Sequence, residues 1–221
     1  MPRIEAVIFD MDGVLVDSEP VHRAASRQLV APHEMTDEQY EQFIGASGTA
    51  FMTWVQSHYD LDATIEELNV RYSAHILEEL RAHPLQPLDG VVDLIAALSQ
   101  KGVLLGVASQ SQPEWVRATL EGAKLHWAFQ AIVAGDAVSF GKPYPDIYLH
   151  TATQLGVPAG ACLAIEDSVP GVAAAAAAGM VVVQSRQGSL PALPQPEAHH
   201  VVDSLRAFDL EWLGGGPSTT R

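Results

Sequence analysis

Short runs of apolar residues without polar alternation recur along the second half of this chain, and another lies near its start. The runs are Ile4–Phe9, Val103–Ala108, Ala131–Ala134, Ala161–Ile165, Met180–Val183 and, more weakly, His200–Asp203. Continuous β-branched and aliphatic runs of this length are typical of strands covered on both faces. Between them lie stretches with a helical pattern: Gly90–Lys101, Pro113–Glu121, Asp146–Leu155 and Gly171–Ala178. Strands that alternate with helices predict an α/β fold with a doubly wound, mostly parallel sheet, a Rossmann-like core.

Two helix signals in the second half are sharper than the rest. Ser111-Gln-Pro-Glu114 fits a capping box with proline in the first turn. The six alanines Ala173–Ala178 predict a helix that lies close against the sheet, because their side chains are small.

The stretch from Val14 to Gln86 has another pattern, helical and without a clear strand, and Pro84 and Pro87 bracket its return. It indicates an all-α helical cap inserted after the first strand. We therefore predict that residues 1–13 and 87–213 form the core, 14–86 the cap, and 214–221 a disordered tail.

The composition limits the classes of molecule that this protein is expected to bind. The 221 residues include 27 Asp and Glu against 12 Lys and Arg, a formal charge of −15. Such a surface repels nucleic acid and anionic lipid, so neither is an expected partner. The N-terminus is too acidic for a signal peptide, and the longest apolar run, Val169–Val183, is too short for a membrane span. We expect a cytoplasmic monomer or weak dimer, in which Cys162 is a buried, inert thiol.

The first candidate for a catalytic motif is Asp10-Met-Asp12-Gly13, where a buried strand is predicted to end. Extended chain has a period of two, so both carboxylates can face one side, and ligands bind at the carboxyl ends of parallel strands. Gly13 permits a sharp turn and a close approach of backbone to ligand. Asp-x-Asp-Gly also opens calcium loops, but here the later ligands are missing, since Val14, Leu15 and Val16 follow.

Four motifs in order resemble those of the haloacid dehalogenase-like hydrolases, and within them the β-phosphoglucomutase-like and sugar-phosphate phosphatase group. They are FDMDGVLVDSEP around Asp10, VASQS around Ser109, FGKPYPDIY around Lys142, and AIEDSVPGVAAAAAAG around Glu166-Asp167. The match covers nearly the whole chain, and 14–86 falls where this family inserts its helical cap. The resemblance implies a Mg²⁺-dependent phosphatase acting on a small phosphorylated metabolite, with an aspartyl-phosphate on Asp10.

The resemblance also assigns roles to residues. Asp10 would be the nucleophile, a task for which a carboxylate is competent in phosphoryl transfer. Asp12 would be the general acid and base, which dehalogenases lack. Ser109, Gln110 and Lys142 would bind the substrate phosphate. Mg²⁺ would be held by Asp10, the backbone carbonyl of Asp12, Asp167, and Glu166 directly or through a water.

Substrate choice is expected to lie in the insertion, where His22 and Arg23 are the leading candidates. Arg27, Trp54, His58, Arg71 and His75 are further ones. A sugar phosphomutase is the first alternative to a phosphatase, although Gly48 and Leu68 stand where mutases of this group tend to carry arginine and lysine. A phosphoacceptor module that does not turn over is a remote second alternative.

Overall fold

The computed structural model describes residues 3–44 and 48–214 of the chain, so residues 215–221 of the predicted tail lie outside it. The chain forms two compact units. The first, called the core unit here, comprises Met1–Asp17 and Leu85–Arg221 as far as these are described. The second, the helical unit, is Ser18–Pro84.

The core unit is built on a parallel six-stranded sheet with the order β3-β2-β1-β4-β5-β6. Its strands are β1 (Ala6–Phe9), β2 (Leu104–Ala108), β3 (Ala131–Val133), β4 (Cys162–Glu166), β5 (Val181–Ser185) and β6 (His200–Val202). β1 lies in the middle, with Phe9 paired to Val107 of β2 on one side and to Ile165 of β4 on the other. The strand order therefore reverses at β1.

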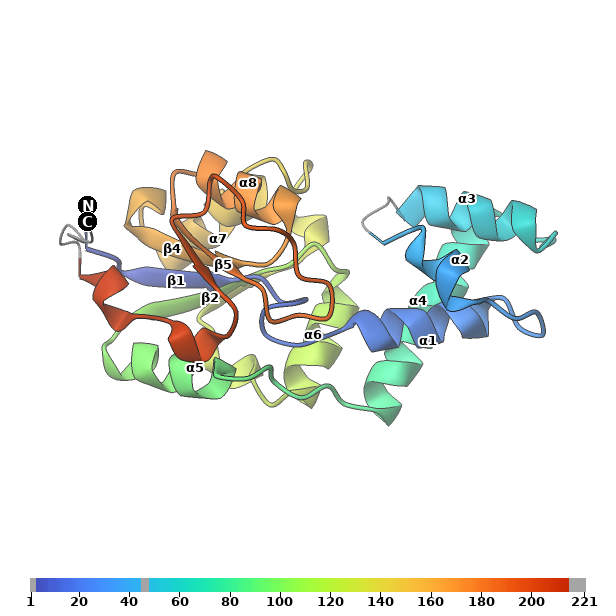
Figure 1. Cartoon of the computed structure of the whole chain (residues 1–221), viewed down its shortest axis with the longest axis horizontal. Helices are drawn as coiled ribbons and strands as arrows, with labels where there is room; N and C mark the ends of the chain where they lie inside the picture. Colours follow the sequence, from blue (N-terminus) through green and yellow to red (C-terminus); the bar gives the residue numbers. More distant parts are fainter. Residues whose placement is uncertain (1–2, 45–47, 215–221) are drawn as a thin grey trace. The chain divides into compact units, whose positions relative to one another are not determined.

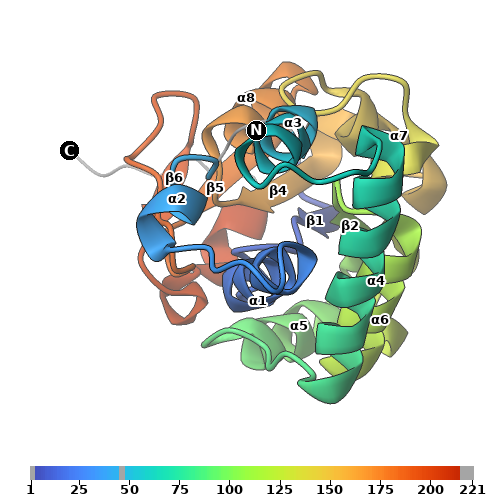
Figure 2. The same ribbon diagram turned by 90° about the vertical axis from the view of Figure 1, so that its right-hand side faces the viewer.

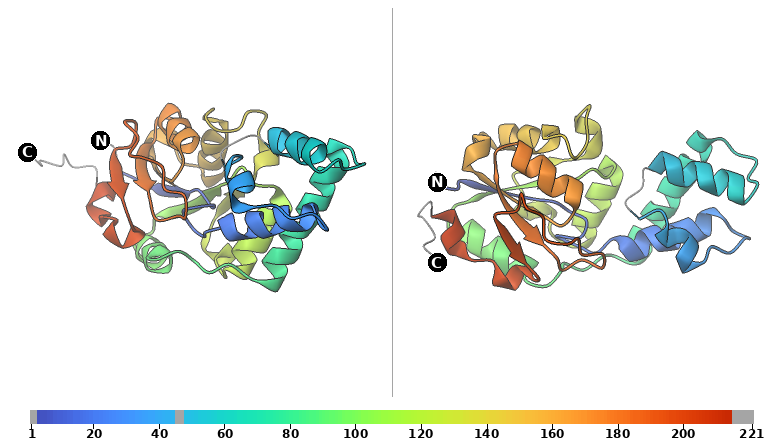
Figure 3. Two further views of the ribbon diagram at one scale, coloured as in Figure 1. Left: turned by 45° about the vertical axis from the view of Figure 1, so that its right-hand side comes forward. Right: turned by 45° about the horizontal axis from the view of Figure 1, so that its top comes forward.

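Helices cover both faces of this sheet, as Figure 1 and the two turned views in Figure 3 show. One face carries α5 (Val91–Gln100) and α6 (Pro113–Gly122), and the other carries α7 (Asp146–Leu155) and α8 (Val169–Ala177). Short 3₁₀ turns complete the unit: η1 (His126–Ala128), η2 (Gly135–Ala137), η3 (Ala159–Ala161), η4 (Leu205–Ala207) and η5 (Leu210–Leu213). The predicted doubly wound α/β fold is confirmed, because strands buried on both faces can be apolar throughout.

The alanine-rich helix α8 shows why small residues stand there. Ala174 and Ala175 are fully buried against β4 and β5, in one cluster with Ala164 and Val182. The helix starts at Val169, two residues earlier than predicted, because the Ser168 side chain caps it by accepting a hydrogen bond from the Gly171 amide.

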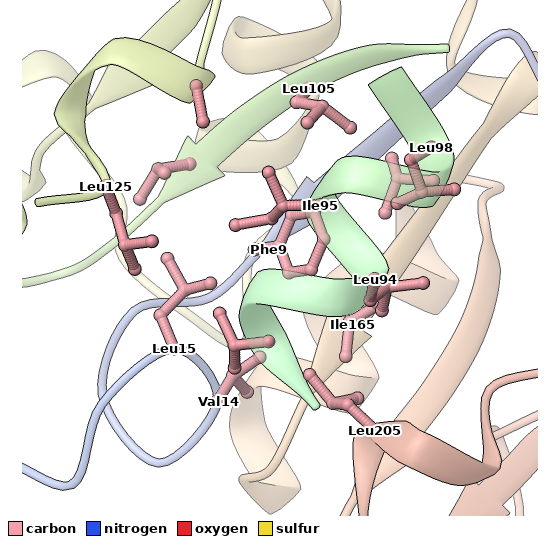
Figure 4. Close-up of a cluster of buried hydrophobic side chains, with 14 of the residues drawn as sticks. Phe9, Val14, Leu15, Leu94, Ile95, Leu98, Leu105, Leu125, Ile165 and Leu205 are labelled. Atoms are coloured by element: carbon pink, nitrogen blue, oxygen red, sulfur yellow. The ribbon is translucent and has the colours of Figure 1, made fainter. Parts of the chain in front are cut away.

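Val14, Leu15 and Val16, expected in the insertion, are instead buried in the main cluster of the core unit. Figure 4 shows Val14 and Leu15 packed with Phe9, Ile95 and Leu125. Val16 also forms β-bridges to Asp12 and to Pro87. The helical unit begins only at Ser18, four residues later than the predicted boundary, because these three apolar side chains are buried in the core unit.

The helical unit contains α1 (Glu19–Leu29), α2 (Asp37–Glu41), α3 (Gly48–His58) and α4 (Ile65–Ala82), seen from another side in Figure 2. Capping boxes start α2 at Thr36 and α4 at Thr64. The unit has its own apolar cluster, which includes Met52, Val55 and Leu68. Among the described residues, no helix has both the length and the apolar character needed to cross a membrane.

Candidate active site

The predicted site residues of the core unit follow the carboxyl ends of neighbouring strands. Asp10 follows β1, Ser109 follows β2, and Glu166 ends β4 with Asp167 directly after it. β1 lies between β2 and β4, so these ends meet where the strand order reverses. In open α/β sheets, the crevice at such a switch point is where ligands bind.

Lys142 joins two of these strand ends. Its Nζ donates to Asp10 Oδ1 at 2.7 Å and to Glu166 Oε1 at 2.5 Å. The Lys142 side chain is 4% exposed and that of Glu166 is fully buried. Buried ion pairs of this kind are weak evidence for stability, but removal of one partner leaves an uncompensated charge. Lys142, from the loop after β3, is thus the cation that allows two carboxylates to be buried side by side.

Glu166 uses both of its oxygens within the protein. Oε1 accepts from Lys142 and from the Tyr148 hydroxyl at 2.9 Å, and Oε2 accepts from the Asp167 amide at 2.9 Å. The Ser168 amide and hydroxyl, each at 3.1 Å, also donate to Oε2. A carboxylate bonded in this way is oriented firmly. Its main task in this structure is to hold Lys142 and the loop that carries Asp167.

Asp167 lies against the backbone of the first motif. A Cβ at Gly13 would overlap the Asp167 carboxylate, and Gly13 also has a φ of +75°. Glycine is required there both for its backbone conformation and for the close approach. One oxygen each from Asp10, Glu166 and Asp167 lie within 4.8 Å of one another. An all-oxygen set of this kind fits a hard divalent cation such as Mg²⁺.

The electrostatics fit a site that is incomplete without a cation. Burial raises the pKa of Asp10 to about 7 despite Lys142, and the charges of Glu166 and Asp12 act in the same direction. Burial, followed by the charges of Asp10 and Glu166, raises the pKa of Asp167 to about 9. Burial disfavours the charge of Glu166 too, yet Lys142 and the other donors hold its pKa below the usual value. Asp10 and Asp167 are therefore the carboxyls with ligand capacity left.

The loop after β2 connects to the first motif through an unexpected residue. Ser111 Oγ donates to Asp12 Oδ2 at 2.9 Å. The predicted capping box of Ser111 and Glu114 is wrong, because α6 is capped at Gln112 without a side-chain hydrogen bond. Ser109 is fully buried and its Oγ accepts from the Ser111 amide at 3.1 Å. The exposed Gln110 has its carboxamide against Gly141, one residue before Lys142.

Four residues belong to this site although the sequence did not single them out, namely Tyr148, Ser168, Ser111 and Gly171. Tyr148 lies six residues after Lys142 on α7, and its hydroxyl is fully buried against Glu166. The available signal was a tyrosine on the predicted buried face of this helix, since a buried tyrosine hydroxyl needs a hydrogen-bond partner. Gly171 was visible only as a helix residue, but a Cβ there would overlap the Glu166 carboxylate.

His22 and Arg23 lie in the helical unit and have partners there. His22 Nδ1 is 3.0 Å from the Tyr72 hydroxyl. The Arg23 guanidinium is 2.6 Å from Asp37 and 3.4 Å from Glu41, and it lies over the Tyr40 ring. Their part in substrate binding stays a prediction.

Comparison with known proteins gives consistent matches. A family model described as haloacid dehalogenase-like hydrolase matches residues 4–179. Hexitol phosphatase B of Escherichia coli (strain K12) is 31% identical over 206 residues, 90% of this chain and 87% of that protein. Protein SUPPRESSOR OF QUENCHING 1, chloroplastic, of Arabidopsis thaliana is 34% identical over 80% of this chain, which spans 17% of that protein. The crystal structure of CbbY from Rhodobacter sphaeroides in complex with phosphate has a TM-score of 0.80 at 26% identity, covering 92% of this chain and 96% of that one.

Gly171→Ala should destabilise the protein by about 3 kcal/mol, because the new methyl group displaces a buried, paired carboxylate. Gly160→Ala is the matched control, since a Cβ at Gly160 meets nothing within 4 Å. Urea unfolding of both variants measures the difference. Equal free energies of unfolding for the two would show that Glu166 does not occupy this position.

Without a divalent cation, stability should fall as the pH rises from about 4 to about 9. The carboxyls of Asp10 and Asp167, with an ordinary pKa of 3.8, keep their protons in the folded state up to about pH 7 and about pH 9, whereas the unfolded chain has already lost them. Asp167→Asn should therefore raise the Tm of the metal-free protein at pH 8 by about 4 °C, or roughly 1–2 kcal/mol. Thermal unfolding in a chelator at pH 5 and pH 8 tests this. A variant that is less stable than wild type at pH 8 would contradict it.

Proposed function

Since the chain belongs to the haloacid dehalogenase-like hydrolases and is a phosphoric monoester hydrolase, we propose that it hydrolyses a small sugar phosphate through an aspartyl-phosphate on Asp10, with Mg²⁺ as cofactor. The observation that carries the proposal is the meeting of Asp10, Asp167 and Lys142 at one strand switch point. Within an acidic chain, this is a local site built to accept a cation and a phosphate together. The family membership confirms the resemblance drawn from the four motifs.

Asp10 would attack with the oxygen that does not accept from Lys142, namely Oδ2. A bond forms between Asp10 Oδ2 and phosphorus while the bond from phosphorus to the substrate oxygen breaks. Asp12 gives its proton to that oxygen, and the alcohol leaves. In the second step a water attacks the phosphorus, Asp12 takes its proton, and the bond to Asp10 breaks to release phosphate.

Lys142, Ser109 and Gln110 would bind the phosphoryl oxygens. Lys142 already lies 2.7 Å from Asp10 Oδ1, so it can stabilise charge that develops beside the nucleophile. Asp10, Asp167 and the backbone carbonyl of Asp12 would hold the metal, and Glu166 would reach it at most through a water because both its oxygens already accept hydrogen bonds. When bound, Mg²⁺ supplies positive charge between the carboxylates and the phosphate.

We favour hydrolysis over transfer of the phosphoryl group back to the substrate. Two positions of the helical unit support this choice. Leu68, which stands where related mutases tend to carry a lysine, is fully buried in the apolar cluster of that unit. Gly48 offers no side chain at the arginine position. Hexitol phosphatase B, a relative along most of its length, acts as its name says on a sugar-alcohol phosphate, which favours a phosphate of that size here. A cytoplasmic location stays a prediction.

Asp10→Asn should lower phosphate release by at least about a thousandfold, because an amide cannot serve as the nucleophile. The measurement is a phosphate-release screen over sugar and nucleotide monophosphates with Mg²⁺, beside mass spectrometry of the trapped phosphoenzyme. Wild-type rates in the variant would exclude the mechanism. A phosphoenzyme that forms without continued phosphate release would instead favour the phosphoacceptor alternative.

Arg23→Ala should lower kcat/KM for the best substrate about tenfold if Arg23 holds the non-reacting end. Arg81→Ala is the control, because Arg81 is an exposed arginine of the same unit that is not a candidate for substrate binding. Equal kcat/KM values for the two variants would limit Arg23 to its ion pairs within the helical unit.

A further inference from the structure

We infer that Ser111 is a positioning residue for Asp12, which its hydroxyl orients for proton transfer to the leaving group. The inference rests on the proposed function, in which Asp12 protonates the departing oxygen. It concerns a residue that is neither a metal ligand nor one of the residues assigned to phosphate binding.

The contact joins two strand ends that are far apart in the sequence. Asp12 lies in the turn after β1, and Ser111 lies in the loop after β2. Within the described part of the chain, the hydrogen bond to the Asp12 carboxylate comes from Ser111 Oγ, at 2.9 Å. Asp12 is half-buried, so solvent alone does not fix its orientation.

Ser111 is itself held on both sides by its backbone. Its amide donates to Ser109 Oγ at 3.1 Å, and its carbonyl accepts from the Gly135 amide at 3.0 Å. Ser109 is fully buried, and a Cβ at Gly135 would overlap the Gln110 backbone. The loop after β2 therefore fits tightly against the loop after β3. A side chain fixed in this way can orient another one.

A carboxyl group that works as acid and base must present one particular oxygen to the substrate. Because Ser111 donates to Oδ2, that oxygen is engaged as an acceptor, and Oδ1 is the oxygen available for proton transfer. The same arrangement serves the second step, in which Oδ1 takes a proton from water. Loss of the serine hydroxyl would leave the carboxyl free to rotate, and misplacement of a catalytic group lowers the rate steeply.

A structural role for Ser111 does not account for this contact. The first turn of α6 does not use its hydroxyl, because α6 is capped at Gln112 without a side-chain hydrogen bond. The hydroxyl is instead directed to a residue of the first motif. Direct binding of the substrate phosphate by Ser111 is the competing role, and it predicts a different pattern of rates.

The test compares two substrates of similar shape whose leaving groups differ. p-Nitrophenyl phosphate releases a stable phenolate and needs little help from an acid, whereas benzyl phosphate releases an alkoxide and depends on one. Ser111→Ala should lower kcat/KM about tenfold for benzyl phosphate and less than about twofold for p-nitrophenyl phosphate. Ser111→Thr, which keeps the hydroxyl, should show nearly the wild-type ratio. Ser99→Ala, an exposed serine on α5, should change neither value.

Each result decides between roles. Equal losses on both substrates in Ser111→Ala would overturn the inference and assign Ser111 to phosphate binding or to folding, which unfolding midpoints then separate. No loss on either substrate, or the same ratio in the threonine and alanine variants, would also overturn it. The Asp12→Asn variant is measured in parallel. If Asp12→Asn does not lose more kcat/KM for benzyl phosphate than for p-nitrophenyl phosphate, Asp12 is not the acid and the proposed function is wrong. If Asp12→Asn shows this larger loss and Ser111→Ala does not, the proposed function stands and this inference fails.

Discussion

Lys142 Nζ lies between the carboxylates of Asp10 and Glu166, within hydrogen-bond distance of both, and all three side chains are almost completely shielded from water. Without the ammonium group, the two negative charges would repel each other strongly in a medium of low polarity. Burial, followed by the charges of Asp10 and Glu166, raises the pKa of the third carboxyl group, Asp167, and Lys142 opposes this rise only in part. This partial compensation makes the site both stable enough to fold and ready to take up a cation.

Much of the surrounding structure serves to keep these groups in place. Glycine stands at two positions where a Cβ would overlap a carboxylate, Gly13 beside Asp167 and Gly171 beside Glu166. Tyr148 and Ser168 fill the remaining acceptor positions of Glu166. Such support is what a preorganised site needs, because charge stabilisation depends on groups that do not have to move during the reaction.

The basic residues of the two units have different partners. In the core unit, Lys142 is directed at the carboxylates of the site, whereas Arg23 and Arg27 of the helical unit pair with acidic residues of that unit. A chain with 12 basic and 27 acidic residues attracts a phosphate only through local positive charge. The proposed chemistry is therefore assigned to the strand ends of the core unit, and selection of the remaining part of the substrate by the helical unit stays a prediction.

The sequence by itself determined the α/β architecture, the presence of a helical insertion after the first strand, the strand ends that carry Asp10, Ser109 and Asp167, and the loop that carries Lys142. Those features depend on local patterns, namely apolar runs, helix periodicity and short motifs, which are readable along the chain. Only the tertiary structure decided that Val14–Val16 belong to the core unit, that Ser111 bonds to Asp12 instead of capping α6, and that Glu166 is saturated by Tyr148 and Ser168. Each of these depends on which distant residue lies nearby, and a side chain chooses among its possible partners only when the fold brings one of them within reach.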